Sequence, residues 1–528
     1  MPGNDYFTPN PLDPREPRVP LERPFRRGWE RPFVRELRWG PAKIRILIVS
    51  DGSSYDENAS FGLGIALADA FDPAHPDHPD YARFEITKAH RGTTSGATPG
   101  FEDFEFSEGS LEEFDEVWLF GVSTSAPYLG AAEVKVLEDF MDAGGGVLAM
   151  GDHEDLGLGL CGGVKRVRSM RKWWFQNPAP PAGMAVAPDS TDLTRNDTVH
   201  AATPGGDVNL GSQGDDRPQT IYPNYRYRWP HWRPFGLAKY PHPVLCGPRG
   251  VITVMPDHAH EGDCIVPDPS FAEEYPGNEA VEVVARGRNV VGRTKGGYTI
   301  TEPREFGLIG AWDGHESGAD AGRVLVDATW HHWFNINLFG LRAENGTEYA
   351  DILAYYRNCA VWLAPPAQQH RMRRAGTLIS LLIPSLVEHT ITWKKLEPER
   401  FYRIGTYAKD ALGRVAPQCQ SAAWFQATIE RYLPGGLKRA LDPERLEKLP
   451  PDDIRRRALA LGAEHVTTAV FGGAMNAVAA QIHERGFGKL DGLHDDIDDL
   501  AARGAKVALE QTGRSLERAC EQLSALAR

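Results

Sequence analysis

The sequence predicts an α/β protein in which a parallel β-sheet is followed by a separate all-helical domain. Over about the first 340 residues, short runs of β-branched and aliphatic residues alternate with helical segments, as in βαβ units. The segments that follow have the apolar spacing of helices. A length of 528 residues also exceeds what one hydrophobic core usually serves, so at least two domains are expected.

The expected elements follow one another in a regular order. The first β-branched run, residues 44–50, ends in Asp51-Gly52, which predicts a buried strand that meets a turn. Helices are expected at 60–71 and at 131–143, and three glycines end the second one. Further strands are expected at 84–89, 116–121, 147–150, 251–254, 281–284, 306–310 and 323–327. Parallel sheets bind ligands beyond the carboxyl ends of their strands, so functional residues are expected just after these runs.

Composition divides the chain into three parts. Residues 1–41 are rich in proline and arginine, which predicts an arm that lies across its own acidic body or reaches a neighbouring subunit of a homo-oligomer. Residues 42–342 form the α/β domain, with a long insertion at about 176–240 that is rich in Pro, Gly, Asp and Asn. Residues 343–528 form the helical domain. Its helices are expected at 349–363, 367–387, 401–412, 421–432, 452–461, 466–485 and 497–526.

Charge and hydropathy argue against several classes of partner. The net charge of −14 argues against general nucleic-acid binding, although a local basic patch remains compatible with it. No apolar run approaches the roughly 18–20 residues that span a bilayer, so no membrane is expected. The polar, proline-rich N-terminus is unlike a secretory signal, so a cytoplasmic location is expected. The six scattered cysteines suggest neither a disulfide framework nor a zinc knuckle.

Three groups of histidine and acidic residues follow predicted strands and would converge at one edge of the sheet. They are Asp152, His153 and Asp155; His258, His260, Glu261 and Asp263; and His331 with His332. Imidazoles and carboxylates together suit Zn²⁺, Fe²⁺ or Mn²⁺, which would lower the pKa of a bound water. The expected metal ligands are His153, His258, His260 and His332. Without a metal, a histidine and a carboxylate could act as general base and acid.

Plainer interpretations of the same residues stay open. Asp152 can cap a helix, and the run from Trp330 to Trp333 can be packing residues. Substrate contacts are expected from Asp51, Arg168, Arg171 and Trp229. The two arginines either receive a phosphate or carboxylate, or pair with acidic residues of an acidic chain. Trp229 lies in an aromatic and arginine-rich run, 222–235, which either stacks on a sugar or base or packs as the core of its own loop.

The order of these parts resembles the trehalose-utilisation (ThuA-like) branch of the class I glutamine amidotransferase-like fold, over about residues 43–340. The matching segments are the strand that ends in Asp51-Gly52, then 144–153, 242–244, 257–261 and 322–332. The resemblance implies a flavodoxin-like parallel sheet with helices on both faces. It also implies a polar substrate such as a carbohydrate derivative. The helical domain lies outside it.

The strand-to-helix elbow departs from the amidotransferase pattern. Amidotransferases of this fold carry a nucleophilic cysteine there, activated by a histidine that a glutamate orients. The elbow at 151–153 has no cysteine, and Cys161 lies about two helical turns downstream, so amidotransferase activity is not expected. The ThuA-like branch places a histidine at the elbow, which His153 matches.

The sequence supports two hypotheses about function. The first is a hydrolase or lyase that acts on a polar small molecule through the histidine and carboxylate groups. The second is a non-catalytic scaffold that keeps the fold and uses its arm and helical domain for assembly. The chain contains no Walker loop, GxGxxG fingerprint or GxSxG elbow, so nucleotide hydrolysis, hydride transfer and serine hydrolysis lack support.

Overall fold

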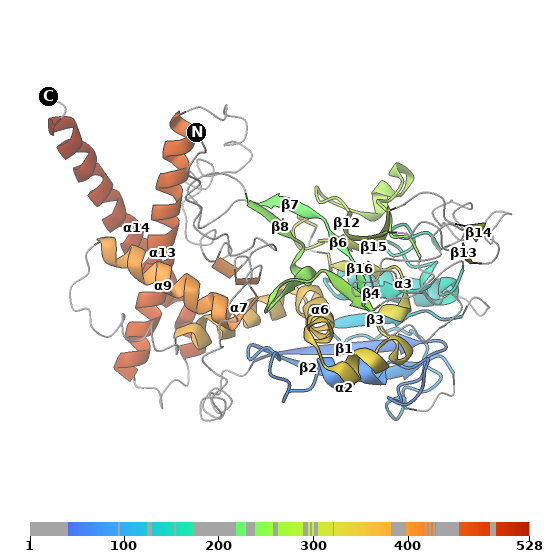
Figure 1. The fold of residues 1–528 in the computed structure, drawn as a ribbon. Helices are drawn as coiled ribbons and strands as arrows, with labels where there is room; N and C mark the ends of the chain where they lie inside the picture. The colour runs from blue at the N-terminus through green and yellow to red at the C-terminus, as the bar shows by residue number, and fades with distance from the viewer. Residues whose placement is uncertain are drawn as a thin grey trace.

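The computed structural model has a central β-sheet with helices packed against it and a group of long helices to one side (Figure 1). The described residues are 41–92, 96–123, 129–152, 155–173, 218–228, 238–256, 262–288, 294–295, 298–299, 305–319, 321–381, 398–417, 420–421, 424–425, 428, 454–485 and 493–526. The arm, most of the insertion and most of the predicted helix at 421–432 therefore lie outside the described residues.

Eight strands form the central sheet in the order β2-β1-β3-β4-β16-β15-β12-β6. The first five of these are parallel to one another. They are β2 (Ala82–His90), β1 (Ala42–Ser50), β3 (Glu116–Phe120), β4 (Gly146–Met150) and β16 (Val324–Asp327). The predicted parallel strands at these positions are confirmed.

The remaining three strands of the sheet run antiparallel to their neighbours. They are β15 (Glu305–Trp312), β12 (Glu282–Arg288) and β6 (Tyr222–Pro223). This edge differs from the fully parallel sheet that the sequence predicts. The reason is the connection from β15 to β16, because residues 313–323 are too few for the helical crossover that joins parallel neighbours.

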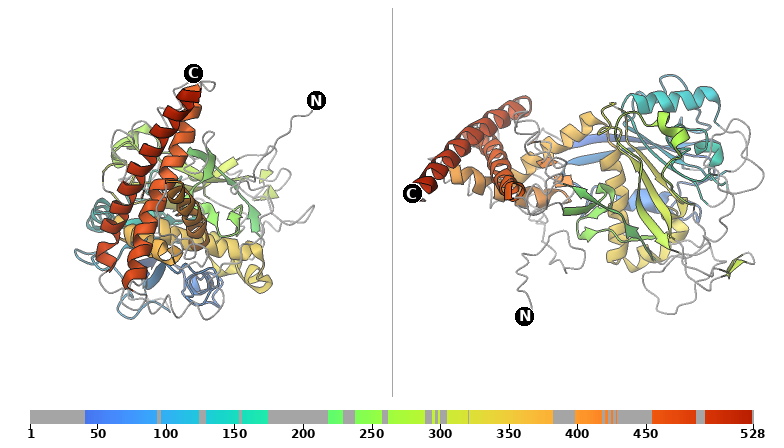
Figure 2. Two further views of the ribbon diagram at one scale, coloured as in Figure 1. Left: turned by 90° about the vertical axis from the view of Figure 1, so that its left-hand side faces the viewer. Right: turned by 90° about the horizontal axis from the view of Figure 1, so that it is seen from above.

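Helices cover both faces of the parallel strands. Figure 2 shows α3 (Ala131–Asp142) on one face, and α2 (Gly64–Ala70) with α6 (Thr347–Leu363) on the other. All residues of β3 and β4 are buried, which explains why both strands are continuous apolar runs. Gly144 ends α3 with a φ of +95°, a left-handed conformation that favours glycine. Helix α6, which begins five residues after the predicted domain boundary at residue 342, packs against β4 and β16 of the sheet.

Short elements fill the connections beyond the central sheet. The predicted strand at 251–254 is divided between β10 (Gly250–Val251) and β11 (Val254–Pro256), because each pairs with a different partner. The partners are β9 (Cys246–Gly247) and β5 (Pro218–Thr220). The other short elements are α4 (Leu158–Cys161), β7 (Tyr225–Arg228), β8 (Ala238–Pro241), η2 (Pro243–Leu245), η3 (Pro269–Glu274), β13 (Thr294–Lys295), β14 (Tyr298–Thr299), η4 (Trp330–His332), η5 (Asn335–Asn337) and α5 (Phe339–Glu344).

Within the described residues, four long helices follow α6. They are α7 (Pro366–Leu381), α9 (Pro398–Val415), α13 (Ile454–Arg485) and α14 (Leu493–Leu526). Three of them, α9, α13 and α14, approach one another backbone against backbone. A Cβ atom at Gly472 of α13 would lie 1.9 Å from the Phe401 carbonyl oxygen of α9, so only glycine allows this approach. The two helices predicted at 452–461 and 466–485 are one continuous helix, α13. None of the helices in the described ranges is both long and apolar enough to cross a membrane.

The cysteines depart from the sequence prediction in one respect. Cys161, Cys264 and Cys359 are buried free thiols. Cys246, in β9, is disulfide-bonded. The scattered spacing of the six cysteines gave no sign of this bond, because a disulfide joins residues that are close in space and not in sequence.

A buried ionic group follows β15. The Nε of Arg323 donates to the Asp313 carboxylate over 2.8 Å. Burial opposes ionisation of Asp313, but the Arg323 charge and hydrogen bond outweigh it and lower the pKa of Asp313 to about 2. Burial and the same Arg323 charge lower the pKa of His315 to about 3. His315 therefore stays neutral in the folded protein well below neutral pH.

His315 is expected to make the fold sensitive to mild acid. An unfolded histidine has a pKa of about 6.5, so acidification from pH 7 to 5 protonates only the unfolded state and removes about 2 kcal/mol of stability at this residue. The fall in thermal unfolding midpoint between these pH values is expected to be smaller in His315→Gln than in the wild type. His483→Gln, in α13, is the control and should keep the full fall. An unchanged fall in His315→Gln would contradict this assignment.

Candidate functional site

Polar side chains gather where β4 and β16 end. We call Asp152, Asp327, Thr329, His331 and His332 the strand-end cluster; all five are fully buried. The two strands are parallel neighbours, with Met150 opposite Asp327. The residues two positions further on, Asp152 and Thr329, therefore leave the sheet side by side. The Trp330 amide donates to the Gly151 carbonyl over 2.8 Å and continues this pairing beyond the strands.

Asp152 and His331 face each other within the cluster. The Thr329 hydroxyl donates to Asp152 Oδ1 over 2.7 Å and accepts from the His331 amide over 3.0 Å. His331 Nε2 lies 3.8 Å from Asp152 Oδ2. On the other side of the ring, His331 Nδ1 lies 2.5 Å from the Asn337 amide oxygen, to which it donates when protonated. A second proton on Nε2 would therefore face the Asp152 carboxylate.

His332 forms a second pair with Asp327. Its Nδ1 lies 2.5 Å from Asp327 Oδ1, and the other carboxylate oxygen accepts from the Tyr355 hydroxyl over 3.0 Å. At the opposite nitrogen, Nε2 lies 3.1 Å from the amide nitrogen of Gln219 in β5. A carboxylate bound to Nδ1 fixes the orientation and tautomer of an imidazole and raises the basicity of Nε2. This is the arrangement that histidine bases and histidine metal ligands use.

Arg171 joins the two turns that carry the cluster. Its side chain is fully buried, and its guanidinium donates to the Ala328 carbonyl over 2.9 Å and to the Asp152 carbonyl. Its charge also lies over the Trp173 ring, 4.4 Å from the ring centre. Burial lowers the pKa of Arg171. The acceptors in its hydrogen bonds are backbone carbonyl oxygens, so its contacts hold the two strand ends together.

Two other predicted substrate contacts lie in different surroundings. Arg168 donates through Nε to Glu274 over 2.7 Å, and no described contact joins it to the cluster. Asp51, after β1, accepts from the amides of Val122 and Ser123 over 2.6 and 3.1 Å. These bonds connect the end of β1 with the end of β3. Burial nevertheless raises the pKa of Asp51.

Five predicted site residues lie outside the described residues. They are His153, Trp229, His258, His260 and Glu261. Pro256 and Gly262 flank the segment that holds His258, His260 and Glu261, and both bind residues next to the cluster. The Pro256 carbonyl accepts from Gln219 over 3.2 Å, and the Gly262 amide donates to the Ala328 carbonyl over 3.1 Å. Among the residues that the structure describes, no three His, Cys, Asp or Glu side chains are grouped to hold a metal ion.

An aromatic group borders His331. Phe61, in the loop after β1, is 41% exposed and meets the Trp330 ring edge-on at 5.7 Å and the His331 ring at 6.2 Å. The Trp330 ring lies 4.0 Å from that of His331. Its buried Nε1 has no hydrogen-bond acceptor within the described part of the chain. Phe61 is thus an exposed side chain that contacts His331, which faces Asp152 in the buried cluster.

Asn335 holds the loop that carries Phe61. Its side-chain amide donates to the carbonyls of Asp56 and Ala59 over 2.8 and 2.7 Å, and its oxygen accepts from the Ile65 amide over 2.8 Å. Sequence reasoning missed this residue, together with Gln219, Thr329 and Phe61. Thr329 alone had a detectable signal, because it follows a predicted strand by two positions, as Asp152 does.

Comparison with known proteins does not assign the chain to a family. No protein-family model matches the chain, and no curated protein matches it. The functional argument therefore depends on the geometry of the cluster.

Arg171→Lys is expected to lower the thermal unfolding midpoint, because one ammonium group cannot reach the carbonyls of both turns. The expected loss is about 3 kcal/mol, from several buried hydrogen bonds. Arg168→Lys is the matched control, and its partly exposed ion pair should cost about 1 kcal/mol or less. Equal losses in the two variants would show that Arg171 does not join the strand ends.

Asn335→Ala is expected to release the loop at 56–62, because three side-chain hydrogen bonds are lost. Amide hydrogen exchange of Ile65 and its neighbours should become faster, while that of β3 and β4 stays unchanged. Asn58→Ala, an exposed change in the same loop, is the control and should leave the exchange of Ile65 unaltered. Slow exchange in Asn335→Ala would mean that other contacts hold the loop.

Proposed function

We propose that the chain is a hydrolase or lyase that acts on a polar small molecule at the strand-end cluster. The observation that carries this proposal is the meeting of Asp152 with His331, since they follow different strands and are 179 positions apart in the chain. A second imidazole, His332, is oriented by its own carboxylate a short distance along the same turn. Clefts beyond the carboxyl ends of parallel strands are the usual ligand sites of such sheets.

The two histidines have different surroundings, which supports different roles. His332 Nε2 is hydrogen-bonded to the Gln219 side-chain amide, and His332 Nδ1 is hydrogen-bonded to Asp327. A substrate or water that replaces the Gln219 amide would therefore meet a basic nitrogen. His331 can take a proton at Nε2, and Asp152 would stabilise the imidazolium that results. In a hydrolysis, His332 would remove a proton from water and His331 would supply one to the leaving group.

The strand order supports a flavodoxin-like assignment, and the ThuA-like branch within it comes from the sequence resemblance alone. The parallel strands have the order β2-β1-β3-β4-β16, which is the 2-1-3-4-5 order of flavodoxin-like sheets. In that order the ligand crevice lies between β1 and β3, where Asp51 bridges to Val122 and Ser123. Cys161 is a buried thiol, and burial raises its pKa, which disfavours the thiolate that a cysteine nucleophile requires. A carbohydrate derivative as substrate comes from the resemblance.

A metal-assisted form of the reaction is a variant of this proposal. His332 Nε2 would be one ligand of Zn²⁺, Fe²⁺ or Mn²⁺, with His153, His258 and His260 as the other candidates. A metal would supply an activated water at neutral pH. Elemental analysis of the purified protein by mass spectrometry distinguishes the two forms, because only the metal-assisted form requires a stoichiometric metal.

The proposal is tested with near-isosteric variants, because the cluster is buried and larger changes would disturb the fold. The protein is first screened against chromogenic nitrophenyl esters, glycosides and phosphates. Asp152→Asn and His331→Gln are expected to lower turnover by about 10²–10⁴-fold, the range of general acid–base catalysis. His370→Gln, in α7 and outside the cluster, is the control and should keep full turnover. Full turnover in the two cluster variants, with unfolding midpoints near that of the wild type, would remove the cluster from the reaction.

The exposed apolar side chains of α14 favour a second function, that of a scaffold. Val507, Leu516 and Leu526 are 41%, 41% and 84% exposed. Such side chains on a long helix suit contact with another chain or a second copy. Light scattering after size-exclusion chromatography, on the full chain and on a chain without residues 1–41, tests this alternative. An assembly that is lost with the arm would favour the scaffold.

A further inference from the structure

We infer that the side chain of Phe61 is a gate through which a substrate reaches His331 and Asp152. The inference rests on the proposed function and adds a further residue to the same site. All five side chains of the strand-end cluster are fully buried. A substrate or water molecule therefore meets them only after a neighbouring side chain has moved.

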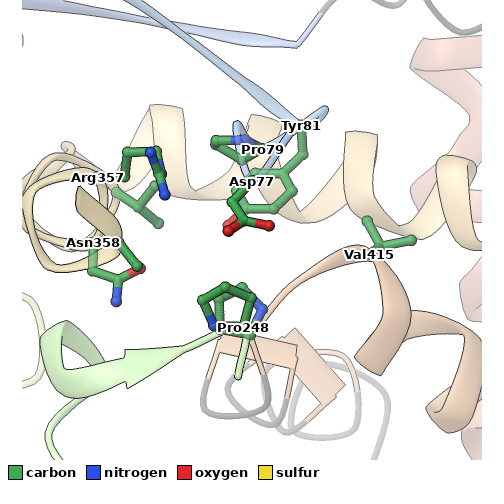
Figure 3. A pocket seen from close by; sticks show the side chains of 10 residues that line it. Asp77, Pro79, Tyr81, Pro248, Arg357, Asn358 and Val415 are labelled. Carbon is green, nitrogen blue, oxygen red and sulfur yellow. The ribbon is translucent and has the colours of Figure 1, made fainter. Parts of the chain in front are cut away.

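The cavity in Figure 3 lies away from the cluster. Asp77, Pro248, Asn358 and Val415 line it, and none of its lining residues belongs to the strand-end cluster. Its volume of about 20 Å³ has room for about one water molecule. A route for a substrate to His331 has to open at the cluster itself.

Phe61 combines exposure to solvent with contact to His331. It is 41% exposed. Its ring lies edge-on to three rings, with centres 5.7, 6.2 and 6.1 Å away, which belong to Trp330, His331 and Phe334. Trp330 and Phe334 are buried and stack on each other, 4.5 Å apart. Phe61 therefore lies between the solvent and the buried aromatic group that includes His331.

The other side chains named above in contact with the cluster are less suited to move. Asn337, Gln219 and Tyr355 are fully buried, and each is hydrogen-bonded to a residue of the cluster. Movement of any of them would leave a buried polar group without its partner, which is costly. Phe61 has no polar side-chain atom, so rotation of its ring breaks only aromatic contacts.

The backbone on both sides of Phe61 is fixed, so the ring can turn while the chain stays in place. The Ser60 carbonyl accepts from the Ile336 amide over 3.0 Å. The Gly62 carbonyl accepts from the Asn335 amide over 2.8 Å. Both donors lie in the turn that follows the cluster. Exposed side chains change rotamer within picoseconds to nanoseconds, so the gate opens without rearrangement of the loop.

Carbethoxylation by diethyl pyrocarbonate tests the gate without an assay of turnover. The reagent transfers an ethoxycarbonyl group to an accessible imidazole nitrogen, and peptide mapping by mass spectrometry reports the rate at each histidine. His331 should react slowly in the wild type. Phe61→Ala should raise this rate about tenfold, because the loss of one aromatic pair corresponds to a factor of that order. His370, partly exposed in α7, is the internal reference and should react equally in both proteins.

Phe339→Ala is the matched control. Phe339 lies in α5 and is 40% exposed, so the variant removes a similarly exposed ring. It should leave the rate at His331 unchanged. An unchanged rate at His331 in Phe61→Ala, or an equal rise in both variants, would overturn the inference. So would an equal rise at the buried His78 in Phe61→Ala, because that result would reflect general loosening of the fold.

The modification rates separate the gate from the proposed reaction. A raised rate at His331 in a protein that turns over none of the screened substrates would uphold the gate and count against the hydrolase or lyase. An unchanged rate in a protein whose turnover depends on Asp152 and His331 would remove Phe61 from the entrance and leave the proposed function in place.

Discussion

The pairing of β4 with β16 is the constraint on which the strand-end cluster depends. The strands are parallel, with Met150 opposite Asp327, so that Asp152 and Thr329 leave the sheet as neighbours. A slip of one residue would move Asp152 by about 3.3 Å along Thr329 and turn the side chains of one strand to the other face. Arg171 reinforces this register, because it binds the carbonyl oxygens of both turns.

Burying carboxylates in the strand-end cluster is energetically unfavourable, and hydrogen bonds offset part of that penalty. Asp327 contacts His332 through one carboxylate oxygen and accepts from Tyr355 and Trp333 through the other. Buried ionic groups of this kind usually add less stability than apolar side chains of similar size. A chain that needed only a stable core would gain more from apolar residues at these positions. The cluster is therefore better explained by chemistry than by stability.

Helix α6 connects the cluster with the β9–β10 hairpin, which carries Cys246. Tyr355 binds Asp327, and Asn358, three positions later, binds the carbonyl of Cys246. Residues three apart lie on neighbouring positions of a helix surface. One rigid element thus contacts both places: the strand ends, where the chemistry is proposed, and the β9–β10 hairpin, in which Cys246 is disulfide-bonded. The packing of α6 on the sheet is what makes these two places parts of one structure.

Much of the α/β part could be predicted from the sequence, because buried parallel strands require unbroken apolar runs such as those at 44–50 and 147–150. Asp152, His331 and His332 could be chosen for the same reason, since they follow such runs. The hydrogen-bond partners of these residues could not be predicted from the sequence. Gln219 comes from a stretch with little periodicity, and Asn337 and Tyr355 lie beyond the last strand of the sheet.

The sequence by itself determined which segments are buried strands and helices, because burial and periodicity are local properties of composition. Only the tertiary structure decided the direction of β15 and β12, the pairing of Asp327 with His332, and the disulfide at Cys246. Each of these depends on which distant segments become neighbours. Periodicity within one segment does not specify its neighbours, since the energy that selects them comes from packing and hydrogen bonds between segments.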